Sequence, residues 1–127
     1  MKRDLHKLTV LVVDDEEAVR DSISELLSGV GYRVLLAADA ATALRLADCE
    51  HPDLVLTDIY MDFSDGYELI AALRRRSQQV RVVAMSVGRD GYDTLRAALH
   101  LGADAVIDKP FPGAGLVETI DRQLAAA

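Results

Sequence analysis

Acidic, hydroxyl and basic side chains follow four separate apolar runs of this 127-residue sequence. In chain order they are Asp14 and Asp15, Asp58, Ser86 and Lys109. Carboxylates that gather at one place repel one another and raise one another's pKa values unless a cation joins them. Mg²⁺ suits such a place because it prefers oxygen ligands and usually pairs one or two carboxylates with a phosphate. A lysine and a hydroxyl group can contact phosphoryl oxygens, so the set is typical of phosphoryl transfer onto a carboxylate.

The segments between these residues alternate between short apolar runs and longer patterns with helical spacing. Strands are predicted over residues 8–13, 33–37, 53–57, 80–85 and 105–107, and helices over 16–28, 39–49, 67–75, 92–101 and 116–125. Gly29 and Gly31 are expected to end the first helix, and Asp39 is placed to cap the second. Five strand–helix units without a repeat or linker predict one α/β domain over residues 1–127, with a parallel sheet covered on both faces.

The ends of the predicted strands are the places where a site is expected. In open parallel sheets, ligands bind beyond the carboxyl ends of the strands, so residues 95 positions apart, Asp14 and Lys109, are predicted to lie at one edge. Taken alone, Asp14 and Asp15 would only favour the start of a helix, and Asp58 would only form a turn. Their joint occurrence after different strands favours a site, with Asp58 on the central strand as its nucleophile.

Composition excludes several other classes of protein. The net charge of −7 argues against a general nucleic-acid or anionic-membrane surface, and Arg74, Arg75 and Arg76 are expected to form a solvated helix end. No apolar run is long enough for a signal peptide or a membrane helix, so a cytoplasmic location is the default expectation. The single cysteine, Cys49, excludes an internal disulfide and is predicted to be a core or half-buried residue.

Four segments, VLVVDDEEAVRDSI, DLVLTDIYMDFSDGYELI, VVAMS and GADAVIDKPF, resemble the receiver domain of two-component response regulators. They are spread across nearly the whole chain in the order found in that family. The resemblance implies a flavodoxin-like fold with strand order 2-1-3-4-5. It also implies that Asp58 is phosphorylated by a sensor histidine kinase or a histidine phosphotransfer protein.

The resemblance assigns roles to individual residues around Asp58. The Mg²⁺ ligands that it implies are Asp14, Asp15, Asp58 and the backbone carbonyl of Tyr60, with Asp15 a more direct ligand than Asp14. Ser86 matches the hydroxyl residue that turns toward the phosphoryl group, and Lys109 matches the lysine that pairs with it. The bond between Lys109 and Pro110 would be cis, which is compatible with an X-Pro bond.

Three positions depart from the pattern of the family. Val106 stands where an aromatic switch residue is usual, Val87 follows Ser86 where alanine or glycine is usual, and Asp62 replaces a frequent proline. None of these changes removes a group that the reaction needs, so they bear on signal readout and rates. The resemblance also places partner contacts on the face of the fourth helix, fifth strand and fifth helix, where it allows a homodimer.

Two alternatives to a phosphorelay module stay open. The first is a docking or dimerisation module that no longer uses phosphate, a reading motivated by Val106 and Val87. The second is a metal-dependent phosphatase of similar topology, but such enzymes usually have a second acid two residues past the nucleophile, and Tyr60 stands there. The favoured interpretation is a signalling domain that is not an enzyme acting on an external substrate.

Overall fold

The computed structural model describes residues 8–61, 64–76, 79–86, 91–109 and 112–126, with the backbone alone for residues 64–65 and 91–95. The elements in chain order are β1 (Thr9–Val13), α1 (Glu17–Val30), β2 (Arg33–Ala37), α2 (Ala40–Glu50), β3 (Leu54–Asp58), β4 (Tyr60–Met61), β5 (Ser64–Asp65), α3 (Gly66–Arg76), β6 (Arg81–Ser86), α4 (Gly91–Leu101), β7 (Ala105–Asp108) and α5 (Gly113–Ala126). All ten predicted strands and helices are present, each shifted by at most a few residues.

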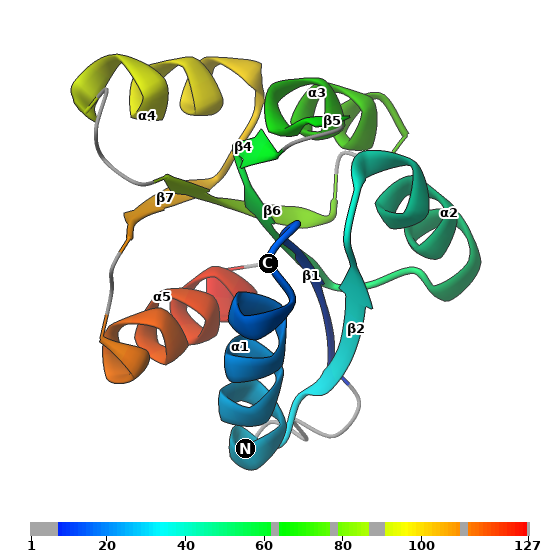
Figure 1. Cartoon of the computed structure of the whole chain (residues 1–127), viewed down its shortest axis with the longest axis vertical. Coiled ribbons are helices and arrows are strands. Elements are labelled where there is room, and N and C mark those ends of the chain that lie inside the picture. The colour runs from blue at the N-terminus through cyan, green and yellow to red at the C-terminus, as the bar shows by residue number, and fades with distance from the viewer. Residues whose placement is uncertain (1–7, 62–63, 77–78, 87–90, 110–111, 127) are drawn as a thin grey trace.

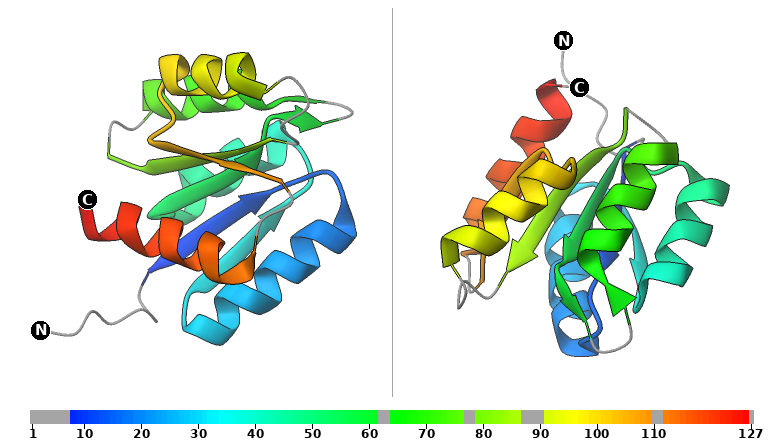
Figure 2. Two further views of the ribbon diagram at one scale, coloured as in Figure 1. Left: turned by 90° about the vertical axis from the view of Figure 1, so that its left-hand side faces the viewer. Right: turned by 90° about the horizontal axis from the view of Figure 1, so that it is seen from above.

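The five longer strands form one parallel sheet in the order β2-β1-β3-β6-β7. With the short β4 and β5 left aside, this is the predicted order 2-1-3-4-5, and the predicted flavodoxin-like fold is confirmed. Helices α2, α3 and α4 cover one face of the sheet, and α1 and α5 cover the other (Figure 1). The left view of Figure 2 shows the same three layers, with the sheet between the two groups of helices.

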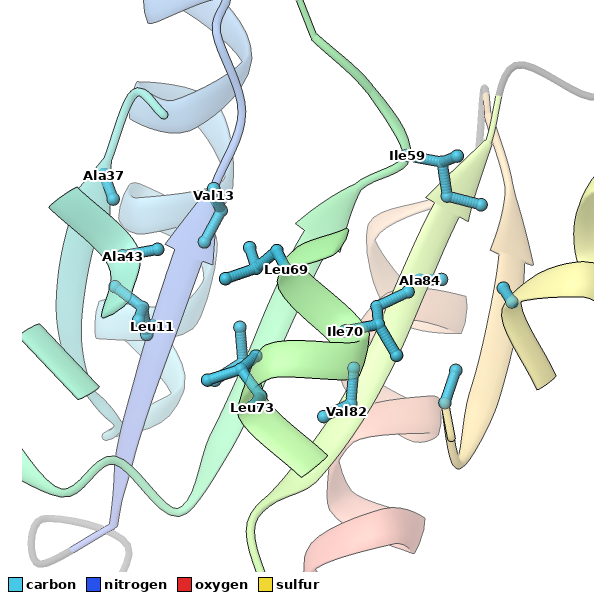
Figure 3. Packing of buried hydrophobic residues seen from close by; sticks show 13 residues of the cluster. Leu11, Val13, Ala37, Ala43, Ile59, Leu69, Ile70, Leu73, Val82 and Ala84 are labelled. Atoms are coloured by element: carbon cyan, nitrogen blue, oxygen red, sulfur yellow. The ribbon is translucent and has the colours of Figure 1, made fainter. Parts of the chain in front are cut away.

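The hydrophobic core lies on both faces of the sheet because alternate strand residues point in opposite directions. Leu11 and Val13 pack toward α2 and α3, whereas Val10 and Val12 pack toward α1 and α5. Figure 3 shows the first face, where Leu69 and other side chains of α3 lie over the middle of the sheet. Strands β1 and β3 are buried along their whole lengths, so their carboxyl ends are held firmly in place.

The helix ends confirm part of the sequence analysis and correct part of it. The Asp39 side chain accepts a hydrogen bond from the backbone N–H of Thr42 at 2.8 Å, so the predicted cap of α2 is confirmed. Helix α1 continues through Gly29 and ends at Gly31, whose φ of 118° is one that glycine adopts readily. Cys49 is exposed on α2, so its predicted core or half-buried position was wrong. None of the described helices has the length and apolar character needed to span a membrane.

A short antiparallel ladder, β4 with β5, follows the end of β3 and was not predicted. Tyr60 pairs with Asp65, and Met61 pairs with Ser64. Each strand has only two residues, which is too short for a periodic pattern to indicate it. The ladder returns the chain to the carboxyl end of β3, where α3 begins at Gly66.

Candidate functional site

The carboxyl ends of the central strands bring the predicted residues together at one edge of the sheet. Asp14 follows β1, Asp58 is the last residue of β3, and Ser86 is the last residue of β6. Asp58 is aligned with Met85 in the neighbouring strand, one position before Ser86. Lys109 follows β7, and its backbone N–H donates to the carbonyl oxygen of Ser86 at 2.5 Å. Ladder pairing between adjacent strands therefore sets the order of these residues along the edge.

Lys109 joins the two buried carboxylates of the site. Its Nζ atom lies 2.7 Å from Oδ2 of Asp14 and 3.3 Å from Oδ2 of Asp58. Asp14 is 0% exposed and Asp58 is 4% exposed. Buried carboxylates without a nearby positive charge would be costly, so the ammonium group of Lys109 stabilises the ionised pair.

Burial and neighbouring charges shift the pKa values of Asp58 and Lys109. Burial raises the pKa of Asp58 above its ordinary value, and the charge of Asp14 adds to this effect, while Lys109 and the backbone N–H of Tyr60 oppose it. Burial lowers the pKa of Lys109, but its hydrogen bond to Asp14 and the charges of both carboxylates outweigh burial and raise that pKa overall. At neutral pH, Lys109 is therefore positively charged, and its ammonium group contacts the carboxyl groups of Asp14 and Asp58.

One carboxylate oxygen of Asp58 has no hydrogen-bond partner within the described part of the chain. Its Oδ1 atom is buried and accepts no hydrogen bond from the described residues. Buried polar atoms are normally satisfied, so an orphaned carboxylate oxygen at the edge of the sheet suits a cation or a reacting group that arrives from solution. Ligand oxygens of Asp14, Asp15 and Glu16 lie within 4.8 Å of one another, and such a hard-oxygen set fits Mg²⁺.

The remaining predicted residues occupy different surroundings. Ser86 is buried beside Asp58 in the sheet. The Tyr60 side chain is 49% exposed and makes an edge-to-face contact with Tyr67. Val106 is half-buried and packs against the core under α2, α3 and α4. The predictions for Pro110, Val87 and Asp62 lie outside the described residues.

Gly66 is a feature of the site that the sequence analysis did not single out. Its backbone N–H donates to the carbonyl oxygen of Ile59 at 2.9 Å. A Cβ atom at this position would lie 2.4 Å from the carbonyl oxygen of Asp58 and 2.6 Å from the Cα atom of Ile59. The start of α3 therefore packs directly against the backbone that carries Asp58, and only glycine leaves room for that approach.

Gly66→Ala is expected to lower the free energy of unfolding by about 2 kcal/mol, because the added methyl group meets backbone that cannot move aside cheaply. The matched control is Gly29→Ala, since a Cβ atom there would meet none of the described atoms within 4 Å apart from its chain neighbours and the adjacent backbone of its own helix. Alanine is favoured over glycine inside a helix by about 0.5–1 kcal/mol, so the control is expected to be neutral or stabilising. Urea unfolding of both variants measures the difference, and equal losses in both would contradict the close approach.

Comparison with known proteins identifies the family to which this fold and this set of side chains belong. The sequence model of the response regulator receiver domain matches residues 10–121. The chain belongs to this family and is a receiver domain of the kind found in two-component response regulators, as the resemblance predicted.

Named relatives and solved structures agree with this assignment. The chain is 38% identical over 108 residues to "Probable transcriptional regulator ycf27" of Cyanophora paradoxa, covering 85% of this chain and 44% of that protein. It is 39% identical over 102 residues to "Response regulator MprA" of Mycolicibacterium vanbaalenii, covering 80% and 44%. The chain thus spans less than half the length of these relatives. The receiver domain of NtrX from Brucella abortus superposes with a TM-score of 0.88 at 33% identity, covering 93% of this chain and 99% of that one.

Proposed function

We propose that Asp58 is a phosphoacceptor and that the protein is a phosphorelay switch. In this proposal a sensor histidine kinase or a histidine phosphotransfer protein supplies the phosphoryl group as phosphohistidine. An Asp58 oxygen attacks phosphorus, the bond between phosphorus and the imidazole nitrogen breaks, and its electron pair returns to the imidazole. The observation that carries the proposal is the carboxylate of Asp58, whose buried Oδ1 atom has no hydrogen-bond partner among the described residues and whose Oδ2 atom contacts the ammonium group of Lys109.

The residues around Asp58 have distinct tasks in this reaction. Lys109 offsets negative charge on the phosphoryl oxygens, and the hydroxyl group of Ser86 donates a hydrogen bond to one of them. Asp14, Asp15, Asp58 and the backbone carbonyl of Tyr60 would hold Mg²⁺. When bound, this ion supplies further neutralisation of phosphoryl charge. Because the acceptor is part of the chain itself, the domain acts as a signalling module and not as an enzyme with an external substrate.

Phosphorylation is expected to change how the domain contacts a partner. The proposed contact face is formed by α4, β7 and α5, and it includes Leu99 and Leu101, two of the largest exposed apolar side chains among the described residues. A homodimer through this face remains a prediction. Val106 on β7 lacks the ring of the aromatic residue usual in the family, so readout through this face is expected to rely on backbone shifts instead of a ring rotation.

The proposal is tested by incubating the protein with acetyl phosphate and Mg²⁺ and measuring the intact mass. One phosphoryl adduct is expected, mapping to the peptide that contains Asp58, and EDTA is expected to prevent it because the carboxylates alone repel the phosphoryl group. An adduct at another residue would mean that the acceptor is misassigned. Absence of both an adduct and Mg²⁺ binding would favour the phosphate-independent docking module.

A further inference from the structure

The connection between β1 and α1 consists of three consecutive acids, Asp14, Asp15 and Glu16. Their ligand oxygens lie within 4.8 Å of one another, so the charges repel in a partly buried loop. Glu16, the residue that precedes α1, makes no side-chain capping hydrogen bond. Other groups must therefore keep this loop in one conformation.

Arg20, in the first turn of α1, reaches back to this loop. Its Nη1 atom donates to the carbonyl oxygen of Asp14 at 2.7 Å. The other atoms of Asp14 are also engaged: its N–H donates to the carbonyl oxygen of Ala37 at 3.2 Å, and its Oδ1 atom accepts from the N–H of Glu16 at 3.0 Å. Lys109 takes the remaining oxygen, Oδ2. Asp14 is thus held at every polar atom, and Arg20 is the charged group that holds its backbone.

The hydrogen bond from Arg20 also controls the direction of the next residue. The carbonyl group of Asp14 and the N–H group of Asp15 belong to one rigid peptide plane. Holding the carbonyl oxygen restrains this plane, which carries the N and Cα atoms of Asp15. The hydrogen bond from the N–H of Glu16 to Oδ1 of Asp14 restrains the next peptide. Together the two contacts limit the directions that the Asp15 side chain can take. We propose that Arg20 is a positioning residue that presents the Asp15 carboxylate to Mg²⁺. This inference rests on the proposed function, because it requires the metal site beside Asp58.

A purely electrostatic effect of Arg20 and a positioning role predict opposite changes in Mg²⁺ affinity when Arg20 is removed. A guanidinium group near a metal site repels a divalent cation, so removing its charge alone would strengthen Mg²⁺ binding. Removing a group that orients a ligand weakens metal binding, typically by 10-fold to 100-fold. The sign of the change in affinity therefore separates a positioning role from a purely electrostatic one.

The experiment measures Mg²⁺ dissociation constants by calorimetry for the wild type, Arg20→Ala, Arg20→Lys and Arg122→Ala. Arg20→Ala is expected to bind Mg²⁺ about tenfold more weakly, and Arg20→Lys, which keeps a charged donor, is expected to lie between it and the wild type. Arg122 is exposed on α5 and pairs with Glu118 one turn away, so Arg122→Ala makes the same change of charge and should leave the affinity unaltered. The amide resonance of Asp15 should shift in metal-free Arg20→Ala, since its peptide plane is released.

The outcomes separate this inference from the proposed function. The positioning role alone would be overturned if the wild type binds Mg²⁺ and is labelled at Asp58 while Arg20→Ala binds Mg²⁺ as tightly as the wild type or more tightly. Absence of Mg²⁺ binding in the wild type would overturn both. Circular dichroism at the temperature of the titration excludes unfolding as the cause of a weaker affinity. If Arg20→Ala is unfolded, Arg20→Lys decides, because retained charge with weakened binding and a shifted Asp15 amide can come only from altered geometry.

Discussion

Lys109→Met is expected to lower the free energy of unfolding by about 3 kcal/mol at neutral pH in Mg²⁺-free buffer. The substitution keeps a long apolar stem and removes the ammonium group that contacts Asp14 and Asp58. Both carboxylates are buried, so the folded state would hold two acids without the cation that joins them. Urea unfolding monitored by circular dichroism measures the loss.

The pH dependence of this loss follows from the raised pKa of Lys109. A lysine whose pKa is raised by folding contributes stability that is fully present below its ordinary pKa of 10.5 and is lost as the pH rises through the raised value. The difference between wild type and Lys109→Met should therefore be steady across neutral pH and should shrink only in strongly alkaline buffer. A difference that vanished already near neutrality would contradict the ion pairs.

An exposed ion pair provides the control for this prediction. Arg33 pairs with Glu50 at the surface, where both side chains contact solvent. Arg33→Met removes one cationic partner in the same way, but exposed pairs typically contribute only about 0.2–1 kcal/mol. A loss for Arg33→Met as large as that for Lys109→Met would mean that burial is not the reason for the effect.

The sheet and its edge were predictable because they depend on patterns that extend over whole segments. Strands in the middle of a parallel sheet are almost uniformly apolar, as in residues 54–56, so the charged residues that follow an apolar run mark where a strand ends. Asp58 and Lys109 stand at such ends, and their proximity followed from the rule that parallel strands present their carboxyl ends at one edge. The distances of 2.7 and 3.3 Å from Lys109 to the two acids agree with that reasoning.

Contacts made by single side chains could not be predicted in this way. Arg74, Arg75 and Arg76 are identical in type and adjacent, and all three were expected to be solvated. The structure shows that Arg74 alone of the three turns inward, where its guanidinium group donates to the carbonyl oxygens of Gly102 and Val80 and pairs with Asp104. The reach of Arg20 to Asp14 and the close approach at Gly66 are of the same kind, because they depend on the path of the backbone between elements.

Asp58→Asn is expected to abolish phosphoryl labelling by acetyl phosphate and, in the absence of Mg²⁺, to raise the free energy of unfolding by about 1 kcal/mol. The amide is nearly the same size as the carboxylate but is a poor nucleophile, so no acyl phosphate forms. Its stabilising effect follows from the cost of the native carboxylate, which is buried, close to Asp14 and unpartnered at Oδ1 among the described residues. An amide in this position removes a buried charge while Lys109 keeps its contact with Asp14.

The pH dependence of stability tests the physical cause of that gain. Folding raises the pKa of Asp58, so the contribution of this group to stability is fully present below its ordinary value of 3.8 and is lost as the pH rises through the raised pKa. The advantage of Asp58→Asn should therefore be small in acid, increase as the carboxylate ionises, and level off once the pH exceeds the raised pKa.

Asp48→Asn is the control, since Asp48 is exposed and pairs with Arg76 at the surface. This variant should be labelled like the wild type, with little change in stability. An Asp58→Asn variant that is more stable than the wild type and is not labelled would show that the protein retains a destabilising acid for its chemistry. A variant less stable than the wild type would contradict this, because it would mean that the ionised Asp58 stabilises the fold through its contact with Lys109.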